Sequence, residues 1–160
     1  MSKNTRLAIA IPCFCEEKLI ESTTTRLLEV LDGLEKKEKI SSSSYIYLVD
    51  DGSSDNTWYE IGLAVARHPN RIKAAKFSTN YGNQKALLAG MLGAKKIGCD
   101  AVITIDADLQ QDENKIEEFI DKYDEGYEIV LGIRNDRSTD GFLKKTTALG
   151  FYKTMELLGV

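Results

Sequence analysis

Two carboxylates one residue apart follow a β-branched apolar run in AVITIDADLQQD, residues 101–112. In an extended segment the side chains of Asp106 and Asp108 would point the same way. If both were ionised about 5 Å apart, they would repel each other by about 3 kcal/mol at an effective dielectric near 20. A proton on one carboxylate, or a divalent cation between them, would relieve this repulsion. Carboxylate oxygens suit Mg²⁺ or Mn²⁺, although a short D-x-D pattern also arises where Asp108 simply caps a turn.

A second acidic segment, VDDGSSDNT, begins at the end of another apolar run. Asp50 takes the last expected strand position and Asp51 follows it. A carboxylate at Asp50 can accept hydrogen bonds from a base N–H or from ribose hydroxyls. Ser53, Asp55 and Asn56 are typical of turns and helix caps. No G-x-G-x-x-G follows the first strand, which argues against the usual dinucleotide-binding fold.

Apolar runs typical of buried strands alternate with amphipathic segments that have helical spacing. The second helix is expected to begin near Ser54 or Asp55 and to stop at Pro69, and the third is expected to begin at Gly82. The pattern predicts strands at 7–12, 45–50, 71–77, 101–106 and 127–134, and helices within 15–40, 51–69, 80–100, 114–126 and 142–159.

This alternation predicts an α/β fold with a mostly parallel sheet and helices on both faces. In such sheets ligands bind outside the carboxyl ends of the strands. We therefore expect one crevice to be formed by the loops that follow Pro12, Asp50, Phe77, Asp106 and Arg134.

Length and composition predict one globular domain over residues 1–160. The net charge of −4 disfavours a nucleic-acid partner bound by bulk charge. Cys13, Cys15 and Cys99 are an odd set without disulfide spacing, which favours reduced thiols in a cytosolic protein. The start, MSKNTR, is unlike a signal peptide, and no apolar run reaches the roughly 20 residues that span a bilayer. The chain as given is therefore expected to be cytoplasmic.

Five segments, IPCFCEE, VDDGSSDNT, NYGNQKALLAG, DADLQ and GIR, resemble in order and spacing the nucleotide-sugar domain of family 2 glycosyltransferases. The resemblance is greatest to the polyprenyl-phosphate branch, which includes enzymes like dolichol-phosphate mannosyltransferase and bactoprenol glucosyltransferase. It implies a GT-A fold, a nucleotide-diphosphate sugar donor, and an inverting transfer assisted by Mg²⁺ or Mn²⁺.

The resemblance also implies which residues bind the nucleoside. Pro12, Phe14 and Glu16 would line its pocket. Asp50 would meet the base, and Asp51 would lie beside it near the ribose. Two of these have plainer alternatives, because Phe14 could be a core residue and Glu16 a carboxylate favoured by a helix N-terminus.

By the same resemblance, Asp106 and Asp108 would form the D-x-D motif of the catalytic site, with Asp108 as the metal ligand. Gln110 and Arg134 would lie near the sugar and the phosphates, and Arg134 would act in catalysis. These roles are chemically sensible, because a cation and a guanidinium stabilise the charge that develops on a nucleoside diphosphate leaving group. Arg134 could instead be a solvated loop charge.

The chain departs from the family pattern at Cys15, where the usual motif P-x-[YF]-N-E has Asn. A thiol cannot supply the two donors and the acceptor of an amide. Either nucleoside binding is weaker here or the Asn has mainly a structural role, and we favour the structural role.

The expected reaction is transfer of a sugar from a nucleotide-diphosphate sugar to a polyprenyl phosphate. A lipid phosphate is already an anion at neutral pH and needs no base, whereas a hydroxyl acceptor does. The alternative is a family 2 enzyme that glycosylates a saccharide hydroxyl in cell-surface polysaccharide synthesis. A non-catalytic nucleotide-binding module is the third hypothesis.

The resemblance implies that the chain would continue past MELLGV into an acceptor-side segment and, in the polyprenyl branch, into membrane helices. The chain is therefore expected to be an N-terminal fragment, and the full-length protein to work at the cytoplasmic face of the membrane. The segment 142–159 mixes apolar residues with Lys144, Lys145 and Lys153. Such a helix could lie on an anionic membrane, pack against the sheet, or join two copies in a homo-oligomer.

Overall fold

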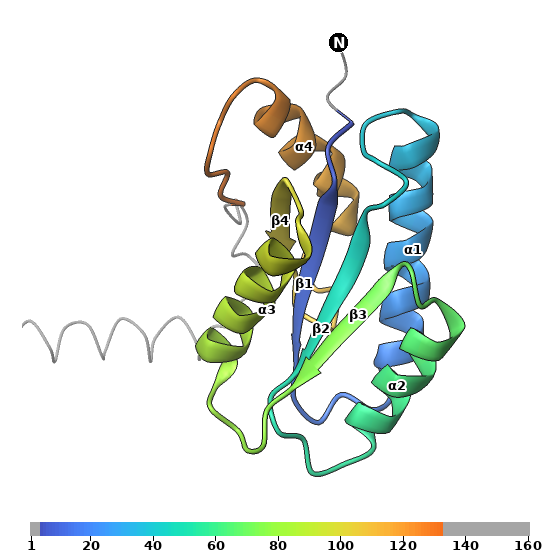
Figure 1. The fold of residues 1–160 in the computed structure, drawn as a ribbon, viewed down its shortest axis with the longest axis vertical. Helices are drawn as coiled ribbons and strands as arrows, with labels where there is room; N and C mark the ends of the chain where they lie inside the picture. The colour runs from blue at the N-terminus through green and yellow to red at the C-terminus, as the bar shows by residue number, and fades with distance from the viewer. Residues whose placement is uncertain (1–3, 133–160) are drawn as a thin grey trace, which may run out of the picture. The chain divides into compact units, whose positions relative to one another are not determined.

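The computed structural model describes residues 4–132, and the compact unit that carries the sheet ends at Glu128. Strands and helices alternate along it (Figure 1). The elements are β1 Leu7–Cys13, α1 Ile20–Lys36, β2 Tyr45–Asp50, α2 Thr57–Arg67, β3 Ile72–Lys76, α3 Asn83–Ile97, β4 Ala101–Thr104, the short 3-10 helix η1 Glu113–Lys115 and α4 Ile116–Asp124.

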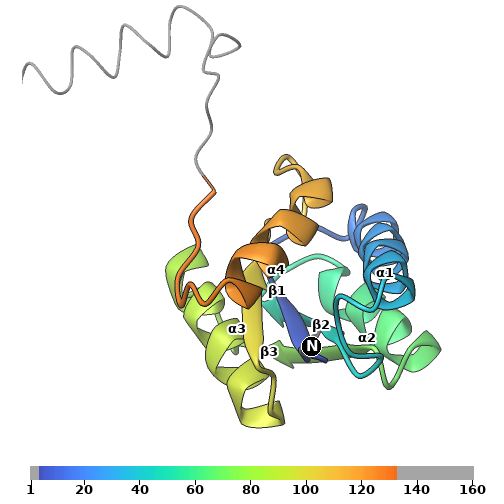
Figure 2. The same ribbon diagram turned by 90° about the horizontal axis from the view of Figure 1, so that it is seen from above.

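The strands form one sheet in the order β3-β2-β1-β4, and every neighbouring pair is parallel. β1 lies between β2 and β4, pairing Ile9 with Ile46 and Ala10 with Thr104. All seven residues of β1 are buried, because helices cover the sheet on both faces (Figure 2). The predicted α/β class, with a parallel sheet between helices, is confirmed.

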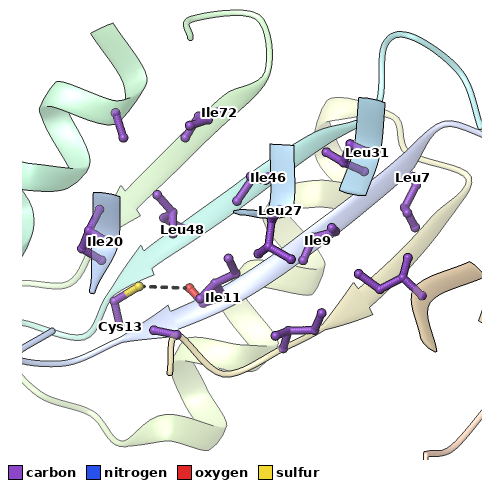
Figure 3. Packing of buried hydrophobic residues seen from close by; sticks show 14 of the residues in the cluster. Leu7, Ile9, Ile11, Cys13, Ile20, Leu27, Leu31, Ile46, Leu48 and Ile72 are labelled. Atoms are coloured by element: carbon purple, nitrogen blue, oxygen red, sulfur yellow. Dashed lines mark hydrogen bonds between the residues drawn. The ribbon is translucent and has the colours of Figure 1, made fainter. Parts of the chain in front are cut away.

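Aliphatic side chains fill the space between the sheet and the layer of α1, α2 and α4 (Figure 3). Each fully buried Leu or Ile contributes about 1.5–3 kcal/mol relative to exposure, so this layer is a main source of stability. The sheet and α1 supply most of it, through Leu7, Ile9, Ile11, Ile20, Leu27, Leu31, Ile46, Leu48 and Ile72.

The other face of the sheet carries α3, which approaches closely because its inner residues are small. A Cβ on Gly90 would lie 3.1 Å from the Cβ of Ala10, and one on Gly93 would lie 2.6 Å from the Tyr47 ring. The Tyr45 hydroxyl, buried beneath the helix, donates a hydrogen bond to the Ala94 carbonyl at 2.9 Å. The stripe of small residues therefore sets the distance between α3 and the sheet.

The observed boundaries differ from the sequence-based ones in several places. The first helix occupies only 20–36 of the predicted 15–40, and the N-cap of α2 is Asn56 rather than Ser54 or Asp55. β4 ends at Thr104, two residues before its predicted end. The predicted fifth strand does not form over 127–132, and its last two residues, like the predicted helix 142–159, lie outside the described residues.

The carboxyl ends of β1, β2 and β3 lie at the same edge of the sheet (Figure 1). Backbone hydrogen bonds continue past the strands and join their loops: Asp51 N–H donates to the Cys13 carbonyl, and Phe77 N–H donates to the Asp50 carbonyl, both at 2.8 Å. Among residues 4–132 no helix is both long and apolar enough to cross a bilayer.

Candidate functional site

The end of β1 presents an exposed aromatic ring beside a partly buried carboxylate. Phe14 follows the strand directly and is 47% exposed, so the alternative that it belongs to the core is wrong. Glu16 is half-buried, and it precedes α1 by four residues rather than lying in its first turn. Pro12 is buried two residues beyond the last β1–β4 pair, where the missing N–H of a proline costs no ladder hydrogen bond.

Cys15 has a backbone φ of 56°, in the left-handed region that ordinary side chains avoid. Its N–H donates to the Ser53 hydroxyl at 2.9 Å, which ties the β1 loop to the β2 loop. Asn tolerates this conformation better than most residues. The structural explanation for the family's Asn at this position is therefore supported by the backbone itself.

Restoring Asn at this position is expected to stabilise the domain. The variant Cys15→Asn should gain about 1 kcal/mol in the free energy of unfolding, because Asn relieves part of the left-handed strain. Glu38, just after α1, has the same conformation at φ 57° and provides the matched control Glu38→Asn. Chemical denaturation measures both. A gain at residue 38 with a loss at residue 15 would contradict the conformational explanation.

The two acidic residues after β2 lie in different environments, and both are buried. Asp51 accepts the N–H groups of Tyr81 and Gly82 at 2.7 and 2.9 Å, so it holds the loop between β3 and α3. Asp50 is completely buried; its Oδ1 accepts Ser53 N–H at 3.0 Å, and its Oδ2 lies 3.4 Å from Lys76 Nζ. Asp51 therefore joins the loop after β2 to the loop after β3, whereas the Asp50 carboxylate holds its own loop and pairs with the end of β3. The base contact expected of Asp50 stays a prediction.

The loop after β4 carries the D-x-D motif in a turn rather than at the end of a strand. Asp106 and Asp108 are both exposed. Asp108 Oδ1 accepts the N–H of Gln110 at 3.1 Å, so the turn-capping alternative describes part of its role. Asp106 is held by the amide of Gln111, which accepts from the Asp106 N–H at 2.8 Å and donates to its carboxylate at 2.6 Å.

Two further contacts fix this loop to the core. The Thr23 hydroxyl of α1 donates to the Ala107 carbonyl at 2.6 Å, and both residues are buried. Leu109 packs against the aliphatic core with a φ of 49°, a strained value for leucine. The loop is thus fastened at its apolar positions, while the carboxylates between them face solvent.

Electrostatics connect the β1 and β4 loops. The pKa of Glu16 is raised above its ordinary value, first by burial and then by the charges of Asp108 and Asp106, with Asp55 last. A carboxylate feels neighbouring charges in this way only at short range. We call Glu16, Asp55, Asp106 and Asp108 the acidic rim. Hydrogen bonds from Cys15 and Glu16 to Ser53 and Thr57 join the β1 and β2 loops, and the charges of the β4 loop act on Glu16; that the five predicted loops form one crevice stays a prediction.

The raised pKa gives a pH dependence that can be measured. Ionised Glu16 is less favourable in the fold than in the unfolded chain, so its ionisation lowers stability as the pH rises from the unfolded pKa through the folded one. The variant Glu16→Gln stays neutral and should be more stable than the parent at pH 7. Thermal unfolding should show this advantage shrinking as the pH falls through the raised pKa of folded Glu16, and gone below a pH of about 4.3, where the parent is protonated in both states. An advantage that grows in acid would contradict the assignment.

The acidic rim suits a hard cation that is completed by another molecule. Within residues 4–132 no three His, Cys, Asp or Glu side chains are gathered closely enough to hold a metal by themselves. Two exposed carboxylates, Asp106 and Asp108, are what Mg²⁺ commonly uses when phosphate oxygens and water supply its remaining ligands. The donor chemistry therefore fits Mg²⁺ or Mn²⁺ bound together with a phosphorylated ligand.

Two residues that position the D-x-D loop were not predicted from the sequence, and one predicted site residue is not among the described residues. Gln111 and Thr23 position the D-x-D loop, yet neither belongs to a recognised motif. The contact of Thr23 with Ala107 spans 84 residues and leaves no local pattern, whereas Gln111 is five residues from Asp106 and reaches it only through the turn between them. The sequence resemblance implies a role near the sugar and the phosphates for the neighbouring Gln110 instead. Arg134 lies outside the described residues. Cys13, Cys15 and Cys99 are free thiols, as expected, and burial raises the pKa of Cys13.

Known proteins with similar sequences are glycosyltransferases. The chain is 48% identical over 154 residues to an uncharacterized glycosyltransferase of Bacillus subtilis, covering 96% of this chain and 45% of that protein. It is 36% identical to a prophage bactoprenol glucosyl transferase homolog of Escherichia coli, covering 92% and 45%. An undecaprenyl-phosphate 4-deoxy-4-formamido-L-arabinose transferase of Edwardsiella ictaluri is 32% identical, covering 89% and 41%. The chain thus spans less than half of each of these relatives.

Two solved structures align with the chain at a TM-score of 0.48. One is a mannosyltransferase from Pyrobaculum calidifontis in complex with GDP-Man and Mn²⁺, with 20% identity over 66% of this chain and 28% of that one. The other is Staphylococcus aureus TarS in complex with UDP, with 18% identity over 82% of this chain and 40% of that one.

The sequence model of glycosyl transferase family 2 matches residues 8–158, which is nearly the whole chain. The matched region contains all the strands of the sheet but the first residue of β1, and it contains the acidic rim. The chain therefore belongs to glycosyl transferase family 2.

Proposed function

We propose that residues 1–160 form a nucleotide-sugar-binding domain that transfers a sugar, with inversion, from a nucleotide-diphosphate sugar to a polyprenyl phosphate. Family membership supports the reaction class. The acceptor is supported by relatives named for undecaprenyl phosphate and for bactoprenol. Because that acceptor is a lipid, we also propose that the protein works at the cytoplasmic face of a membrane.

One arrangement carries the proposal: β1 and β4 pair in parallel, so that the loops carrying Glu16, Asp106 and Asp108 leave the sheet at the same edge, and the two aspartate charges add to the effect of burial in raising the pKa of Glu16. A surface with this much negative charge would repel a sugar diphosphate. A divalent cation reverses the sign of that interaction, since it is attracted by the carboxylates and by the phosphates alike. The acidic rim is thus understandable as one half of a site whose other half is a metal-bound diphosphate.

Each side chain has a distinct part in this proposal. Asp108 binds the cation, and Asp106 lies beside it toward the donor. Exposed Phe14 offers a face for the nucleoside. Asp50 and Asp51, both buried, hold the rim loops in place. When bound, Mg²⁺ or Mn²⁺ would neutralise the charge that develops on the departing diphosphate.

The transfer itself needs no base from this chain. A phosphate oxygen of the acceptor forms a bond to the anomeric carbon while the bond from that carbon to the donor diphosphate breaks. The attacking oxygen carries no proton to remove, because the phosphate is ionised at neutral pH. The domain's task is to hold the donor in line and to stabilise the leaving group.

A thermal-shift panel tests the donor class. UDP-, GDP- and dTDP-sugars are each added with and without Mn²⁺ to the folded chain. We expect one nucleotide class to raise the melting temperature, and to do so only with the metal, since binding to the native state stabilises by RT ln(1 + [L]/Kd). If no nucleotide shifts a folded sample under either condition, the proposed function is wrong.

A further inference from the structure

Gln111 makes two hydrogen bonds to Asp106 at once. Its Oε1 accepts the Asp106 backbone N–H at 2.8 Å, and its Nε2 donates to Asp106 Oδ2 at 2.6 Å. An amide is suited to this task because it carries an acceptor and a donor on one planar group. The second bond is charge-assisted, which makes it stronger than a neutral one.

We propose that Gln111 is a positioning residue that fixes the Asp106 carboxylate for the metal-bound donor, which rests on the proposed function. Asp106 is exposed, and an exposed aspartate otherwise samples several rotamers. By holding both the backbone and one carboxylate oxygen, Gln111 selects one of them and leaves the other oxygen for the ligand. The ordering is then complete before the donor arrives, so binding loses less side-chain entropy.

The turn between the two residues explains why the contact is specific to position 111. Ala107 is held by Thr23, and left-handed Leu109 reverses the chain direction. The Leu109 N–H donates to the Asp106 carbonyl at 3.2 Å, which closes the turn and returns residue 111 to Asp106. Gln110 directly follows the turn, and its backbone N–H donates to Asp108 Oδ1.

The first experiment needs no ligand. In the full chain, Gln111→Met keeps the length of the side chain but removes its donor and acceptor. Hydrogen exchange followed by NMR should show the Asp106 amide exchanging about 10-fold faster than in the parent, because its acceptor is gone. The control is Gln84→Met, at an exposed glutamine on α3. An unchanged Asp106 exchange rate in Gln111→Met would overturn the proposal.

The second experiment measures the affinities of UDP, GDP and dTDP with Mn²⁺ by calorimetry. For the nucleotide that the parent binds, Gln111→Met should weaken binding about 10-fold, or ~1.4 kcal/mol, while Gln84→Met leaves it unchanged. Faster Asp106 exchange with undiminished affinity would overturn the positioning role and leave the proposed function intact. A folded parent that binds none of the three with Mn²⁺ would overturn the proposed function, and the role of Gln111 in donor binding with it.

Discussion

Replacing Asp108 by Asn should abolish the Mn²⁺-dependent stabilisation by nucleotide while the ligand-free protein stays as stable as the parent. At a ligand concentration of 100 Kd, binding contributes about 2.7 kcal/mol, which raises the melting temperature of a domain of this size by roughly 5–10 °C. The variant loses that increment because an amide lacks the charge that attracts the cation. Its fold is kept because Asn Oδ1 can still accept the Gln110 N–H. Thermal unfolding with and without Mn²⁺ and nucleotide measures both parts.

Asp112 provides a matched control for this substitution. Its Oδ1 accepts the N–H of Asn114 at 3.0 Å, so it caps a turn in the same way as Asp108, four residues further along. It is exposed and lies outside the acidic rim. Asp112→Asn should therefore keep the whole metal-dependent increment. If Asp108→Asn also keeps it, Asp108 is not the metal ligand.

The variant Gly52→Ala should destabilise the domain by about 3 kcal/mol, a cost typical of a strained backbone combined with overpacking. Gly52 has a φ of 69°, and a Cβ there would lie 2.3 Å from the Thr79 carbonyl carbon and 2.6 Å from Asn80 N. Both contacts are to backbone, so no side-chain rotation relieves them. The rim loops after β2 and β3 must separate, which should weaken nucleotide binding as well. Urea unfolding followed by circular dichroism measures the loss of stability.

Gly62 is the control for this prediction, because a Cβ there meets nothing within 4 Å. It lies inside α2, where alanine is favoured over glycine by about 1 kcal/mol. Gly62→Ala should therefore stabilise the protein while Gly52→Ala destabilises it. Equal and small effects at both positions would show that the two rim loops are not packed as described.

The sheet could be predicted from the sequence because its central strands are covered on both faces. β1 and β2 therefore appear as continuous apolar runs, and the helices between them show helical spacing. The predicted fourth strand is too long because the apolar pattern continues through Ile105. That residue is buried and still donates its N–H to Ala10, although it lies past the strand. Family membership and the parallel α/β sheet together confirm the GT-A fold class.

The predicted strand 127–134 shows where local pattern is insufficient. Its described residues include apolar and β-branched side chains, yet no strand forms over 127–132. Strand propensity mainly reflects the neighbours that a strand packs against, so an apolar run alone does not define one. Nothing in the segment itself identifies a partner strand.

At the site, the rule that ligands bind at the carboxyl ends of parallel strands is enough to bring the β1, β2 and β4 loops together. The burial of Asp50 could have been predicted as well, because the period of two places it on the same face as Ile46 and Leu48. The charge of Asp50, taken without this periodicity, favours the prediction of a contact with a nucleoside instead. Gln111 could not be singled out, because its role depends on a left-handed residue at Leu109.

Paramagnetic broadening by Mn²⁺ tests the acidic rim most directly. NMR spectra of the chain are recorded with trace Mn²⁺ and the nucleotide diphosphate that the thermal-shift panel selects. We expect signals of residues 106–110 and of residues 14–16 to broaden together, because one cation would lie between the β4 and β1 loops. Broadening confined to the acidic surface of α4, or equal with and without nucleotide, would contradict it.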